Sequence, residues 1–192
     1  MEVFAHIKTV VSIILGLGIG TLLNGTARFI QHPKRTKPYW IHLLWAFYIF
    51  LTLVHFWWWE YKLRLLSEWT FLEYFFLIIY IVFYFVLCQL LFPTDVKDFD
   101  NSYKNYFYSR KKWFFSILAL VYVIDFFDTL IKGQQYYDTV MPMYGIRMVS
   151  HFIICIVFAF TKSKSPLLYG SMVIFFILFE LYFIVSRYYI NV

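Results

Sequence analysis

Six long runs of apolar residues alternate with short polar links along this chain. The runs cover residues 9–29, 39–59, 69–92, 113–132, 146–161 and 166–188. A spanning α-helix needs roughly 20 largely apolar residues to cross the hydrocarbon core of a bilayer. The links contain residues that end or begin helices, such as Pro33, Pro93 and Gly133. The pattern therefore predicts six membrane-spanning helices, of which the fifth is the shortest.

Composition supports an all-α, polytopic integral membrane protein. Hydrophobic residues make up 62% of the 192 residues and charged residues only 15%, against roughly 25% charged in soluble domains. A soluble chain of this length could not bury so much apolar surface. We therefore expect a single membrane-embedded domain over residues 1–192, folded as a compact helical bundle. A soluble enzyme, a coiled coil and a disordered chain are excluded.

The link between the third and fourth runs is the longest and has a character of its own. Phe99, Tyr103 and Tyr106 recur in it at helical spacing, with several lysine and arginine residues around them. This pattern favours a short amphipathic helix over about 97–112 that lies on the inner membrane surface. A docking surface for a cytoplasmic partner is the alternative interpretation.

Positive charge is distributed unequally between the two sides of the predicted bundle. The net charge is +6, and eleven of the 17 lysine and arginine residues belong to the first, third and fifth links. By the positive-inside rule these links face the cytoplasm, and both termini are non-cytoplasmic. We expect the protein to reside in the inner membrane of a bacterium or in a plasma membrane. The cations then contact the lipid bilayer, and nucleic acid is not an expected partner.

Most ionisable residues in or beside the spans lie toward the non-cytoplasmic side. Counted along each span, this side holds His55, Glu60, Glu73, Asp125, Asp128, Arg147, His151 and Glu180. The inner half offers mainly Asn24, His42, Gln89 and the cysteines. Ionisable side chains in a membrane are costly, and they commonly mark ion or proton pathways. We therefore expect a polar cavity, open to one face and closed by apolar packing toward the other, that takes a cation or a proton.

Some of these carboxylates have an ordinary structural explanation. Three have a cation four or seven residues along the same helix: Asp128 with Lys132, Glu60 with Arg64, and Glu180 with Arg187. Structural pairing is the favoured interpretation for Asp128 and Glu60. For Asp125 and Glu180, which lie deeper, structural pairing and function stay open as equal alternatives.

His55 and His151 are the candidate metal or haem ligands. Imidazole nitrogen with carboxylate oxygen can bind zinc or another divalent ion, but no HExxH or HxxxH pattern is present. No cofactor is predicted; one haem or one divalent metal ion held by His55 and His151 is the alternative. Cys88 and Cys155 lie in apolar runs without a CxxC pattern, which is typical of buried hydrophobic residues.

The first span is rich in glycine. Gly16 and Gly20 form a GxxxG pattern, which allows another helix to approach closely. A partner helix within the chain is the favoured interpretation, and association with a second subunit is the alternative.

Three functions remain, and no motif decides among them. The leading hypothesis is a channel- or transporter-like protein, in which Asp125, Glu180 and Glu73 line a path for a cation or proton. The second is a non-enzymatic partner or sensor subunit of a membrane complex. The third is a membrane enzyme acting on lipid or a redox carrier, which is less favoured because no Walker A or G-x-S-x-G motif occurs. A homo-oligomer or a membrane-protein partner is expected.

Overall fold

The protein is a bundle of long helices. A computed structural model describes residues 2–66 and 69–187, and this part of the chain contains no strand. The six long helices are α1 (Glu2–Gln31), α2 (Trp40–Trp59), α3 (Phe71–Leu91), α4 (Tyr103–Ile131), α6 (Met143–Phe160) and α7 (Pro166–Arg187). All six are long and apolar enough to cross a membrane. The protein is therefore an all-α, multi-pass integral membrane protein, as the apolar runs predicted.

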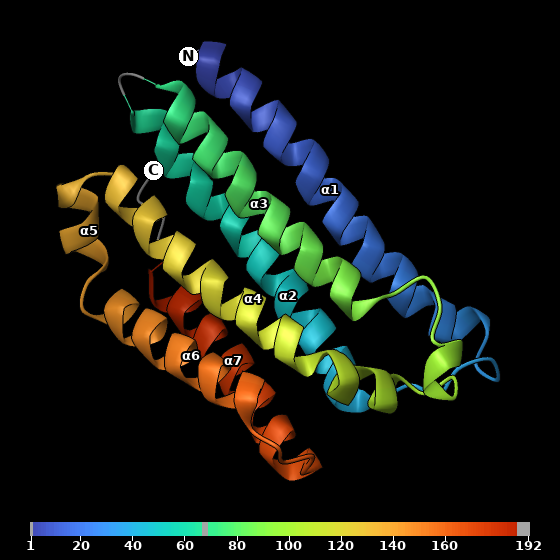
Figure 1. Ribbon diagram of the computed structural model, residues 1–192. Helices are drawn as coiled ribbons and strands as arrows, with labels where there is room; N and C mark the ends of the chain where they lie inside the picture. The colour runs from blue at the N-terminus through green and yellow to red at the C-terminus, as the bar shows by residue number, and fades with distance from the viewer. Residues whose placement is uncertain (1, 67–68, 188–192) are drawn as a thin grey trace.

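The long helices pack in two layers (Figure 1). The first layer contains α1, α3, α4 and α6, in which each helix contacts the next. The second layer contains α2 and α7, which contact one another. α2 also contacts α1, α3 and α4, so it lies at the centre of the bundle, whereas α1 forms one edge.

The connections gather at two opposite ends of the bundle (Figure 1). At the first, here called the link end, lie residues 32–39, residues 92–102 with the short 3-10 helix η2 (Lys97–Phe99), and residues 161–165. At the second, here called the α5 end, lie the 3-10 helix η1 (Glu60–Leu65) and the short helix α5 (Gln134–Val140). The first, third and fifth links therefore share one end, as the hydropathy pattern required.

α4 begins ten residues earlier than the apolar pattern indicated. Residues 103–112 were expected to belong to a separate helix on the membrane surface, but they form the first turns of α4. Ser102 caps this helix through its side-chain oxygen, and no proline or glycine interrupts it. Tyr103 and Phe107 are buried against the bundle. The aromatic face of this segment therefore serves internal packing.

α1 packs against α3 through glycines other than the expected pair. A Cβ atom added to Gly25 would lie 2.1 Å from the ring of Phe92, and Gly18 also faces α3. In contrast, a Cβ atom on Gly16 or Gly20 would meet no described atom within 4 Å. The close contact within the chain thus uses Gly18 and Gly25, and the face with the GxxxG pattern is left uncovered by the described residues.

Candidate functional site

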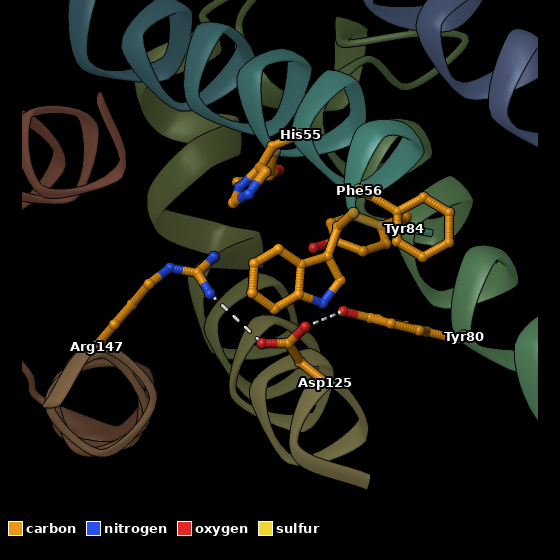
Figure 2. Close-up of a pocket in the computed structure, with 8 residues that line it drawn as sticks. His55, Phe56, Tyr80, Tyr84, Asp125 and Arg147 are labelled. Carbon is orange, nitrogen blue, oxygen red and sulfur yellow. Dashed lines mark hydrogen bonds and ion pairs between the residues drawn. The ribbon is translucent and has the colours of Figure 1, made fainter. Parts of the chain in front are cut away.

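Five polar side chains from five helices meet in the interior. We call them the deep cluster: His55 of α2, Tyr80 of α3, Asp125 of α4, Arg147 of α6 and Glu180 of α7. Arg147 donates from Nε to Glu180 Oε2 at 2.9 Å and from Nη1 to Asp125 Oδ2 at 3.4 Å. The other oxygen of Glu180 bonds to His55 Nδ1. Tyr80 donates its hydroxyl to Asp125 Oδ1 at 2.8 Å (Figure 2). One continuous network thus ties five helices together.

The deep cluster lies in the half of the bundle toward the α5 end. Counted along the helices, its members are about 6–14 Å from the helix ends on that side. Glu180 is fully buried, and Asp125 and Arg147 are 8% and 6% exposed. Charges in a low-dielectric interior are tolerated when partners surround them. The sequence placed His55, Asp125, Arg147 and Glu180 on one side of the membrane, and the structure joins these four in one hydrogen-bonded chain.

The charges of the deep cluster nearly balance. The guanidinium of Arg147 has a fixed positive charge, and it faces the carboxylates of Asp125 and Glu180. His55 is the remaining member that can gain a positive charge, by binding a proton. With both carboxylates ionised and His55 protonated, the cluster is neutral. Gain or loss of one proton therefore changes the net charge that the surrounding apolar helices enclose.

A small cavity adjoins the deep cluster. Its volume is about 10 Å³, and His55, Trp59, Asp125 and Arg147 are among its lining residues (Figure 2). That volume accommodates about one water molecule. Nε1 of Trp59 has no acceptor among the described residues. The polar cavity that the sequence predicted is therefore no larger than about one water molecule in this structure. The polar side chains fill the remaining space by pairing with one another.

A second charged group lies closer to the α5 end. Lys132 donates to Glu60 Oε1 at 2.8 Å and bonds to Asp128 Oδ2; we call these three residues the end cluster. The Asp128–Lys132 pair matches the helical spacing, whereas Glu60 pairs with Lys132 instead of the expected Arg64. Burial lowers the pKa of Lys132, but the two carboxylates outweigh burial and raise this pKa above its usual value.

Trp59 lies between the two clusters. Its ring centroid is 5.5 Å from that of His55, and Nζ of Lys132 is 5.5 Å from the Trp59 ring. Asp125 and Asp128 lie one turn apart on α4, yet each belongs to a different cluster. An aromatic side chain thus separates the deep network from the end cluster.

Two other predicted site residues lie outside both clusters. Glu73 lies in the first turn of α3 and forms a capping box with Thr70. The Glu73 carboxylate accepts from Thr70 N at 2.8 Å, and Thr70 Oγ1 accepts from Glu73 N at 3.3 Å. Glu73 therefore has a structural partner at the helix start. His151 is fully buried, and its ring centroid is 4.1 Å from that of Phe176. Its role here is aromatic packing beside the deep cluster.

The described residues offer little to a metal ion. Within residues 2–66 and 69–187, no group of three His, Cys, Asp or Glu side chains is placed to hold one. The ring of His55 is engaged by Glu180, and that of His151 is packed among phenylalanines. The alternative of haem or metal at His55 and His151 gains no support from this arrangement.

Sequence reasoning missed the roles of Tyr80 and Trp59. α3 and the end of α2 are so rich in aromatic residues that nothing in the sequence distinguishes these two from their neighbours. The bridging role of Arg147 was also absent from the predictions, because its partners Asp125 and Glu180 are 22 and 33 residues away. These contacts arise only when the helices pack.

No protein-family model, curated protein or solved structure matches this chain. The candidate function therefore rests on the geometry of the two clusters and on the membrane-spanning fold.

Proposed function

We propose that this multi-pass membrane protein is a small proton-linked, transporter-like protein, and that the deep cluster is its proton-binding site. One observation carries the proposal: Arg147 bridges Asp125 and Glu180 inside the bundle, with His55 on the same glutamate. Ionisable groups buried within spans characteristically form proton relays and ion sites. Histidine is also a common proton shuttle in proteins.

The arrangement favours a proton over a metal cation. Arg147 already occupies the position between the two carboxylates, so an incoming cation would meet its positive charge and would have to displace it. A proton needs no additional volume, and the adjoining cavity of about 10 Å³ is sufficient for one water that carries it. The cation alternative thus requires a rearrangement that the proton does not.

Proton binding has a direct structural consequence in this network. Arg147 joins α6 to α4 through Asp125 and to α7 through Glu180. A proton on either carboxylate removes the negative charge that holds Arg147, so it weakens one of these helix–helix links. Such a shift between two packings is how a bound ligand moves a membrane protein between conformations.

The experiment is proton transport by the purified protein in liposomes that contain a pH-sensitive dye. An imposed membrane potential should drive proton movement through the wild-type protein. Asp125→Asn and Glu180→Gln should reduce it to the rate of empty liposomes. Asp138→Asn is the matched control, because Asp138 is exposed on α5 and, among the described residues, its side chain bonds only to Gln134 four residues away. No movement in the wild type, or equal rates in all variants, would overturn the proposal.

A second candidate function is favoured by α1. This helix lies at the edge of the bundle, and a Cβ atom added to Gly16 or Gly20 would meet no described atom within 4 Å. A non-enzymatic subunit of a membrane complex, or a homo-oligomer, would use such a face for close helix contact. Native purification tests it: a stoichiometric partner or second copy should be lost in Gly16→Leu/Gly20→Leu, and a monomer in mild detergent would contradict it.

A further inference from the structure

The link end of the bundle has a basic pocket that neither cluster uses. Its volume is about 420 Å³, and it lies between the end of α1, residues 31–36 and residues 93–103. The residues that define its chemistry are Arg28, His32, Arg35, Thr36, Lys97 and Asn101. Pockets of this size are typical of small-ligand sites. We infer that this basic pocket binds the phosphate-containing headgroup of an anionic phospholipid.

Charge is the first observation that carries this inference. Asp95, which also lines the pocket, forms an ion pair with Lys97 at 3.2 Å, so these two charges offset each other. Among the described residues, no carboxylate oxygen lies within 4.0 Å of a side-chain nitrogen of Arg28 or Arg35. Two guanidinium groups therefore supply an excess of positive charge. Their planar geometry suits bidentate contact with phosphate oxygens.

The walls of the basic pocket are held in place by backbone bonds. Lys37 N donates to Asn101 O at 2.8 Å, and Tyr103 N donates to Lys37 O at 3.2 Å. Asp95 further accepts from Lys97 N at 2.8 Å. These bonds join the 32–39 link to the 92–102 link before any ligand arrives. A site whose walls are already ordered loses less conformational entropy when it binds.

The position of the pocket points to a lipid rather than to free phosphate. Arg28 lies in the last turn of α1, where a spanning helix reaches the headgroup level. Ile30, two residues further along, is 82% exposed and offers apolar surface next to the cationic one. A phospholipid satisfies both contacts, since its phosphate pairs with the arginines and its acyl chains cover the exposed side of α1. Basic pockets between spanning helices are known to select anionic headgroups.

The test is lipid binding by the full-length protein in neutral detergent, followed by native mass spectrometry. Phosphatidylglycerol should remain bound to the wild-type protein, and phosphatidylcholine should not. The Arg28→Gln/Arg35→Gln variant should bind phosphatidylglycerol about tenfold or more weakly, given the contribution of each basic residue near a headgroup. Lys62→Gln/Arg64→Gln is the matched control, because it removes two exposed cations from the α5 end and should retain full binding.

Two further measurements distinguish a lipid site from a site for a free anion and from general attraction to the basic surface. Arg28→Lys/Arg35→Lys preserves the charge and loses the planar fork, so its affinity should fall between those of the wild type and the glutamine variant. Glycerol phosphate at the concentration of the lipid should not displace phosphatidylglycerol. Displacement would show that the pocket binds a free anion, and it would overturn the inference of a lipid ligand. Equal loss of phosphatidylglycerol binding in the control, or unchanged binding in Arg28→Gln/Arg35→Gln, would show that the lipid is attracted to the basic surface in general and would also overturn the inference. This inference does not depend on the proposed proton site.

Discussion

The deep cluster and the end cluster have the same basic inventory, two carboxylates and one fixed cation, but they satisfy it differently. In the deep cluster all four carboxylate oxygens have a partner, supplied by Tyr80, His55 and the two bonds of Arg147. In the end cluster, Oε2 of Glu60 has none among the described residues. The difference teaches how depth governs pairing. Both clusters are shielded from solvent, but five helices supply partners deep in the bundle, whereas only η1 and α4 supply them at the end cluster among the described residues.

The largest expected effect comes from removing the cation of the deep cluster. Arg147→Met leaves the buried carboxylate of Asp125 without a counter-charge and that of Glu180 with His55 alone. We expect the free energy of unfolding to fall by about 3–5 kcal/mol. Titration of the detergent-solubilised protein with SDS measures this loss. A smaller loss of stability in Arg147→Met than in Lys132→Met would contradict the comparison. Depth in the bundle would then have no influence on the cost of leaving a charge unpaired.

A combined variant separates stability from function in the deep cluster. Arg147→Met/Asp125→Leu/Glu180→Met replaces all three charges with apolar side chains of similar size. Since apolar replacement of a whole buried network is often neutral, most of the lost stability should return. Proton transport in liposomes should remain absent. Recovery of transport together with stability would assign the network a structural role alone.

Removing the cation of the end cluster should have a smaller effect. Lys132→Met deprives Glu60 and Asp128 of their partner at the end of α4, where opening of the last turn exposes the two carboxylates to water. We expect a loss of about 2 kcal/mol. The raised pKa of Lys132 means that its positive charge persists in the folded protein above 10.5, the unfolded value. SDS titration of the wild type and the variant at pH 7, where Lys132 is charged in the folded and the unfolded state, measures the difference.

A single hydrogen bond in the deep cluster comes next. Tyr80→Phe removes the hydroxyl that donates to Asp125 Oδ1 and preserves the aromatic ring. The expected loss is about 1.5 kcal/mol, the usual size for a bond to a charged group. Tyr182→Phe is the control, since Tyr182 is 57% exposed on α7. Equal SDS midpoints for the two variants would show that Tyr80 does not support the cluster.

The smallest effect is expected for Glu73, which belongs to neither cluster. Glu73→Ala removes one half of the capping box at the start of α3 and should lower stability by about 0.5–1 kcal/mol. Proton transport should match that of the wild type. Loss of transport in this variant would show that Glu73 lines the cation or proton path, as the sequence suggested. It would contradict the proposal that the proton site is confined to the deep cluster.

Sequence patterns predicted the location of charge better than its partners. Counting along the spans placed Asp125, Glu180, His55 and Arg147 toward one side, and these residues are in contact in the structure. The same counting grouped them with Glu73, which caps a helix at the same end. Depth along a helix follows from residue number at a fixed rise. The direction in which a side chain points depends on how each helix is rotated against its neighbours.

The sequence by itself determined the class of this protein, since six apolar runs and scarce charge leave a spanning helical bundle as the stable outcome. It also determined the local pair of Asp128 and Lys132, because four residues make one helical turn. Only the tertiary structure decided that Arg147 meets Asp125 and Glu180, and that the basic pocket forms from two distant links. Those contacts join segments far apart in the chain, and helix periodicity contains no information about which helices become neighbours.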